Sequence, residues 1–137
     1  MNLDRVDSGR KLPDEFNVII EIPMNADPVK YGVDKATGAV IRCRPIGVLM
    51  MDDEAGGDAK LLAVPIDRIL PIYKHWSKPD DLQPERLMQI QHFFEHYKDL
   101  EVGKWVKLRG WEGPETAKRE IMDGLERYRQ ADIKPQF

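Results

Sequence analysis

Residues 47–64, GVLMMDDEAGGDAKLLAV, form the stretch of sequence on which the fold depends. Apolar runs at residues 47–50 and 61–64 flank four carboxylates, a lysine and the Gly56-Gly57 pair. Strand-like runs on both sides of a glycine-rich turn predict a β-hairpin whose tip turns at the two glycines. The tip has two interpretations. It is either an acidic turn in water or a site for a hard cation, with a lysine suited to a phosphate on the metal.

The totals indicate one soluble globular domain spanning residues 1–137. Charged residues make up 33% of the chain and the hydrophobic set 42%, which is typical of a folded protein. A net charge of −3 argues against a dominant nucleic-acid-binding role, which favours a basic face. The single cysteine, Cys43, excludes an intrachain disulfide, and no apolar run reaches membrane-spanning length. We therefore expect a cytoplasmic protein.

Strands are predicted before the hairpin. Residues 16–22 form a β-branched run closed by a proline, and residues 29–33 suggest a second short strand. The apolar segment 39–51 is long for one strand and contains Pro45, which is disfavoured in a central strand. It therefore predicts either two strands or one strand bent near Pro45.

Helices are predicted after the hairpin. One begins near Pro84, and its apolar stripe faces the core. A half-buried strand at residues 104–109, a turn at 110–113 and a last helix from Pro114 follow. The order of strands, helix, strand and helix predicts an α+β fold with a small sheet or barrel and two main helices. The first stripe consists of Leu87, Ile90, Phe94 and Tyr97, and the second of Ala117, Ile121, Leu125 and Tyr128.

Two features at the first predicted helix suggest a function but are not sufficient by themselves to establish it. The segment HFFEH at residues 92–96 matches the H-x-x-E-H zinc-peptidase pattern. A peptidase needs a third zinc ligand further along the chain, and only a strand and an ordinary amphipathic helix follow. Lys98 is suited to hold a phosphate, but a lysine is also favoured at the C-terminal end of any helix.

Five blocks of sequence occur in a defined order along the chain. They are EIP at residues 21–23 with KY at 30–31, IRCRPIGVL at 41–49, MDDEAGGDAKL at 51–61, HFFEHYKDLE at 92–101 and GKWVK at 103–107. In this order they resemble the soluble (family I) inorganic pyrophosphatases, and in particular the bacterial members. The resemblance extends over nearly the whole chain.

The resemblance implies a magnesium-dependent inorganic diphosphatase, in which a metal-activated water attacks pyrophosphate at the mouth of a small OB-like β-barrel. Several Mg²⁺ ions lower the pKa of the water and neutralise the leaving phosphate. Family precedent also implies a homo-oligomer, a hexamer. The implied site residues are Asp53 and Asp58 on metal, Glu21 as a carboxylate near the metal or its water, Lys60 near phosphate, and Lys30, Tyr97 and Lys98 on phosphate oxygens.

The chain departs from the family pattern at two places. Gly32 stands where the family usually has a glutamate after Lys-Tyr. Val40 is followed directly by Ile41, whereas the family has a longer block there, including the Asp-x-Asp-Pro-x-Asp motif that holds the main metal aspartates. The long segment around Pro45 is therefore interpreted as the seam of an internal deletion between residues 40 and 41. The barrel is then incomplete, with open strand edges.

Three hypotheses remain open at this point. The chain is a pyrophosphatase with impaired activity, or a catalytically dead remnant that acts as an oligomerising or binding module. Alternatively, the molecule contains a segment that the printed sequence lacks, which an intact mass above 15.8 kDa would reveal.

Overall fold

The computed structural model describes residues 7–20 and 39–132. The predicted strand at residues 29–33, the site residues Glu21 and Lys30, and Gly32 lie outside the described residues. In chain order the elements are β1 (Phe16–Ile20), β2 (Ala39–Asp53), β3 (Gly56–Gly57), β4 (Lys60–Pro65), the 3₁₀ turns η3 (Pro71–Tyr73) and η4 (Pro79–Asp81), α1 (Pro84–His96), β5 (Val106–Glu112) and α2 (Pro114–Gln130). Among these helices, none is long and apolar enough to span a bilayer.

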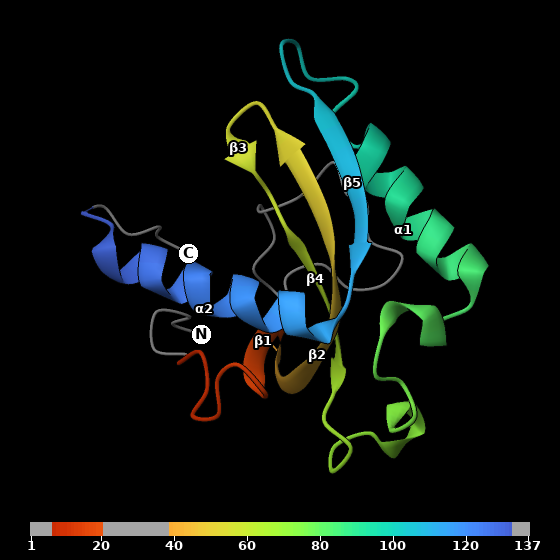
Figure 1. The fold of residues 1–137 in the computed structure, drawn as a ribbon, viewed down its shortest axis with the longest axis vertical. Helices are drawn as coiled ribbons and strands as arrows, with labels where there is room; N and C mark the ends of the chain where they lie inside the picture. The colour runs from red at the N-terminus through yellow and green to blue at the C-terminus, as the bar shows by residue number, and fades with distance from the viewer. Residues whose placement is uncertain (1–6, 21–38, 133–137) are drawn as a thin grey trace.

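Strand β2 is the centre of the sheet, and the other strands all pair with it in antiparallel fashion (Figure 1). Strand β1 pairs with the first part of β2 and β5 with its last part. Strands β3 and β4, which follow the hairpin turn, pair back onto β2. Successive side chains of a strand point to opposite faces. Val48 and Leu49 are both fully buried, so this part of β2 is covered on both faces. That explains why its sequence is apolar without alternation.

The segment around Pro45 forms one strand with an irregularity, so the second of the two predicted alternatives is the closer one. The pairing of β2 with β4 shifts register between Pro45 and Gly47. The β1 pairing ends at Cys43 and the β5 pairing begins at Val48, so Pro45 lies between them. A proline is tolerated there because a bulge interrupts the ladder of N–H donors.

The acidic hairpin is confirmed, but its turn was placed wrongly. The chain reverses at Glu54 and Ala55, and the two glycines instead pair with Asp52 and Asp53 as β3. Gly56 has a φ of +120°, which a residue with a Cβ rarely adopts. The glycine pair therefore shapes the return strand rather than the turn itself.

Both predicted helices are confirmed, and each begins at its predicted proline. The predicted turn at residues 110–113 is wrong, because β5 continues to Glu112. Its pairing with β2 shifts register between Met50 and Met51, next to Gly110 with a φ of +108°. A glycine in this conformation accommodates a bulge without ending the strand.

The core lies between β2, β4 and the chain that leads into α1. Ile46, Val64 and Leu82 form a buried cluster, to which Tyr73 and Trp76 add partly buried rings. Helix α2 packs against β2, and α1 packs against β5 (Figure 1). The prediction of an α+β fold with two main helices is confirmed, and the open sheet is consistent with an incomplete OB-like barrel.

Candidate functional site

The acidic turn and the end of α1 meet at one ion pair. Lys98 Nζ lies 2.7 Å from Asp53 Oδ2, although the two residues are 45 positions apart in sequence. The other oxygen of Asp53, Oδ1, accepts a hydrogen bond of 2.8 Å from the Ala55 backbone N–H. Both oxygens of this carboxylate therefore have donors.

The ion pair is well shielded from solvent. The Lys98 and Asp53 side chains are 12% and 10% exposed, and Lys98 also lies 3.3 Å from Glu54 Oε2. Hydrogen bonds from Lys98 and from the Ala55 N–H lower the pKa of Asp53 below its ordinary value. The bonds to Asp53 and Glu54 raise the pKa of Lys98 well above its usual range. Asp53 is therefore ionised and Lys98 protonated at neutral pH.

A second ion pair forms at the start of β4. Lys60 Nζ lies 2.7 Å from Asp58 Oδ1, and both side chains are partly exposed. The same ammonium lies 5.6 Å from the centre of the Phe94 ring in α1. The hairpin and α1 are thus connected twice, by Lys98 with Asp53 and by Lys60 with Phe94.

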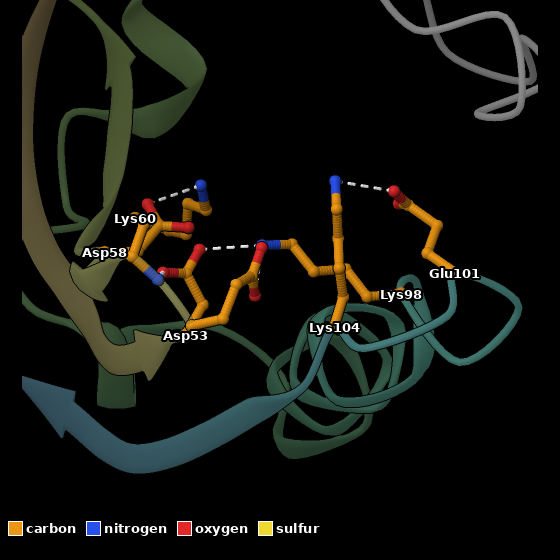
Figure 2. A network of polar contacts seen from close by, with 8 residues as sticks. Asp53, Asp58, Lys60, Lys98, Glu101 and Lys104 are labelled. Carbon is orange, nitrogen blue, oxygen red and sulfur yellow. Dashed lines mark hydrogen bonds and ion pairs between the residues drawn. The ribbon is translucent and has the colours of Figure 1, made fainter.

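Figure 2 shows these two pairs beside a third, in which Lys104 Nζ lies 2.6 Å from Glu101 Oε2. The bond to Glu101 raises the pKa of Lys104. The Arg109 guanidinium on β5 binds Asp52 at 2.5 Å. Each of the four carboxylates of the acidic turn therefore has a cationic partner.

Four of the predicted site residues, Asp53, Asp58, Lys60 and Lys98, join in these contacts. Tyr97 is the C-terminal cap residue of α1, 37% exposed, and Lys98 lies 5.6 Å from the centre of its ring. The structure thus brings five predicted residues to one region. The remaining two, Glu21 and Lys30, lie outside the described residues.

Sequence reasoning gave no site role to several participants, among them Glu54, Phe94 and Lys104. Glu54 is adjacent to Asp53 and shares its partner, Lys98. Phe94 was assigned only to the apolar stripe, although helical spacing places it beside Tyr97 and Lys98, three and four residues later. That spacing could have identified Phe94 as a neighbour of the site. No local pattern distinguishes Lys104, which is placed by the loop after α1.

The histidine pair of α1 has its own local contacts. The rings of His92 and His96 lie 4.6 Å apart, and His96 Nδ1 lies 2.9 Å from Asp99 Oδ2. Across residues 7–20 and 39–132, no group of three or more His, Cys, Asp or Glu side chains is placed to hold a metal ion. The described site therefore offers paired carboxylates rather than an assembled metal centre.

Comparisons with known proteins agree with one another. Residues 36–129 match the family model described as inorganic pyrophosphatase. An inorganic pyrophosphatase of Xanthomonas campestris pv. campestris is 43% identical over 173 aligned positions, which cover 93% of this chain and 97% of the relative. A solved inorganic phosphatase of Anaplasma phagocytophilum has a TM-score of 0.79 at 32% identity, covering 85% of this chain and 95% of that one. A pyrophosphatase of Coxiella burnetii has a TM-score of 0.77 at 34% identity, covering 86% and 96%.

Proposed function

The chain belongs to the inorganic pyrophosphatase family, and from that membership we propose that it hydrolyses inorganic pyrophosphate to two phosphates at a reduced rate. The observation that carries the proposal is the meeting of the hairpin and α1. It gathers two carboxylates, two lysines and a tyrosine, which are groups suited to bind a metal ion and phosphate oxygens.

In this proposal Lys60, Lys98 and Tyr97 bind the oxygens of pyrophosphate. Charge-assisted hydrogen bonds from ammonium groups to phosphate oxygens are stronger than neutral ones, and the tyrosine hydroxyl adds a further donor. Both lysines already pair with carboxylates, so an anion that binds them competes with Asp58 and Asp53. Lys30 and Glu21 belong to the same proposed site.

Family membership implies a divalent metal, which we propose to be Mg²⁺ because carboxylate oxygens are its preferred ligands. Asp53 and Asp58 have the right chemistry, but the described residues do not fit an assembled magnesium site. Among the described residues no three His, Cys, Asp or Glu side chains are placed to hold one ion, and both Asp53 oxygens already have donors.

The reduced rate follows from the proposed deletion between residues 40 and 41. The Xanthomonas alignment spans 173 positions, more than the 137 residues of this chain, so that relative has residues without a counterpart here. Strand β2 runs from Ala39 through Ile41 without interruption. The absent family motif, Asp-x-Asp-Pro-x-Asp, would supply the further carboxylates.

Phosphate release from magnesium pyrophosphate tests the proposal, with an intact relative measured in parallel. We expect slow release that Lys60→Met and Asp53→Asn both abolish. A rate equal to that of the intact relative would contradict the proposed impairment. Intact mass spectrometry comes first, because a mass clearly above 15.8 kDa would disprove the deletion.

A second candidate is a catalytically dead chain that acts as an oligomerising or binding module. The observation that favours it is the lack of an assembled metal-ligand group among the described residues. Calorimetry separates the two candidates, because a dead chain gives no heat with Mg²⁺ and pyrophosphate. Under either candidate we propose a cytoplasmic homo-oligomer, with a hexamer expected from the family, which light scattering measures.

A further inference from the structure

Three aromatic side chains form a cluster at the C-terminal end of α1, namely Phe93, Phe94 and Tyr97. Phe94 meets Tyr97 edge to face, with ring centres 5.6 Å apart and planes at 83°. Phe93 packs on the same two rings, stacking on Tyr97 at 5.7 Å and meeting Phe94 edge-on at 5.1 Å. Edge-to-face and offset-stacked pairs at these distances are the favoured aromatic arrangements.

Two ammonium groups lie on this cluster, each over a different ring. Lys60 is 5.6 Å from the centre of Phe94, and Lys98 is 5.6 Å from the centre of Tyr97. The face of an aromatic ring attracts a cation within about 6 Å. Lys98 lies next to Tyr97 in sequence, whereas Lys60 lies on β4. Of these two cation–ring contacts, the one between Lys60 and Phe94 therefore joins distant elements.

Lys60 is held by two partners of different kinds. Asp58, two residues earlier, binds the ammonium at 2.7 Å but belongs to the same hairpin. Phe94 is therefore the contact that relates Lys60 to α1, and it is also the neighbour of Tyr97. One side chain thus links two residues that come from separate elements.

We propose that Phe94 is a positioning residue that sets Lys60 relative to Tyr97, so that both groups reach one pyrophosphate. This role rests on the proposed function, in which Lys60 and Tyr97 bind the substrate. Phe94 acts through its ring face and its packing, and it makes no contact with the reacting atoms in the proposal. A bulky apolar side chain without a ring keeps the packing volume but loses the attraction for the ammonium.

The first test measures geometry and needs no substrate. In NMR spectra of the full chain, the Hε protons of Lys60, assigned with Lys60→Arg, are expected to carry a ring-current shift from Phe94. Phe94→Leu should abolish that shift, while Phe94→Tyr keeps it. Phe93→Leu is the matched control, because it removes a neighbouring ring that does not hold Lys60. A Lys60 shift that survives in Phe94→Leu would overturn the proposal.

The second test measures binding of magnesium pyrophosphate by calorimetry. We expect Phe94→Leu to weaken binding about two- to five-fold, the loss of one partly exposed cation–π contact. Phe94→Tyr should restore wild-type affinity. Wild-type affinity in Phe94→Leu, or an equal loss in Phe94→Tyr, would overturn the positioning role. If Phe94→Leu does not fold, Phe94→Met serves the same purpose.

The two tests separate this inference from the proposed function. A wild-type chain that binds no magnesium pyrophosphate contradicts the proposed function. In that case the NMR shifts still decide whether Phe94 positions Lys60.

Discussion

Lys98, just beyond the C-terminal end of α1, pairs with two carboxylates of the acidic turn, Asp53 and Glu54. Its bonds lower the pKa of Asp53, so this carboxylate stabilises the fold at pH values above its unfolded pKa. The stabilisation is lost as the pH falls through the lower folded pKa. The raised pKa of Lys98 affects stability at high pH. Its contribution is fully present below the unfolded pKa of lysine and is lost only in strong alkali, as the pH rises through the folded pKa.

Replacing Lys98 with methionine should therefore destabilise the protein in a pH-dependent way. The difference in unfolding free energy between wild type and Lys98→Met should be larger at pH 7 than at about pH 3. Below the ordinary aspartate pKa the unfolded chain binds a proton at Asp53, so the advantage of holding this carboxylate ionised in the folded state begins to be lost. Urea unfolding at the two pH values measures it. Lys107→Met, at an exposed position of β5, is the control and should show no such dependence. A pH-independent difference for Lys98→Met would show that the ion pair does not contribute.

A substitution at Tyr97 can distinguish the packing role of its ring from the proposed substrate-binding role of its hydroxyl. Tyr97→Phe keeps the ring that contacts Phe93, Phe94 and Lys98, but removes the hydroxyl. We expect unchanged thermal stability and binding of magnesium pyrophosphate weakened by about two- to ten-fold, the worth of one hydrogen bond. Differential scanning fluorimetry and calorimetry measure the two quantities. Unchanged binding would remove Tyr97 from the proposed substrate site.

At the scale of elements, β2 is held close to the chain that leads into α1. A Cβ added at Gly47 would lie 2.4 Å from Pro79 Cγ in η4 and 2.9 Å from the Glu112 carbonyl oxygen. Side chains essentially never approach this closely, so Gly47 permits η4 to pack on β2. The buried Leu82 follows η4 directly, and the same contact therefore places the core cluster.

Gly47→Ala should accordingly destabilise the fold by about 1–3 kcal/mol, the usual cost of overpacking. Urea unfolding measures the change. Gly124→Ala is the matched control, because Gly124 lies inside α2 and a Cβ added there would be 3.7 Å from Arg127 Nη2, an ordinary contact distance. Alanine should stabilise that helix by about 0.5–1 kcal/mol. A neutral Gly47→Ala would mean that η4 moves away without cost.

Sequence patterns located most elements, and they failed where a bulge replaced an expected break. Pro84 and Pro114 marked the helix starts because proline suits the first helical turn. Pro45 and Gly110 gave the same kind of local signal, yet β2 and β5 continue through them. The reason is tertiary, since pairing along β2 stabilises both strands on either side of the irregularity.

For the whole molecule, the charge balance of the site determines how it responds to metal. Each carboxylate of the acidic turn already has a cationic partner, namely Arg109, Lys98 or Lys60. Mg²⁺ binds where several oxygens converge, and here it must compete with ammonium groups at Asp53 and Asp58. The folded state is therefore expected to depend little on metal.

Removal of divalent cations with EDTA should leave the Tm unchanged, and millimolar Mg²⁺ should raise it by less than about 2 °C, as expected for weak binding. An intact relative, treated identically, serves as the reference. Scanning calorimetry measures both proteins. A fall of more than about 5 °C with EDTA would show that the chain holds a resident metal, against the proposed loss of ligands.

The sequence by itself determined most of the elements and the chemical character of the site. Hydrophobic spacing, helix-starting prolines and the acidic hairpin are local features, and the order of the motif blocks identified the family. Only the tertiary structure decided which distant residues meet: Lys98 with Asp53, Lys60 with Phe94, and η4 with Gly47. These contacts join residues 32 to 45 positions apart, and no local pattern encodes them. They depend on how β2, its partner strands and α1 pack together.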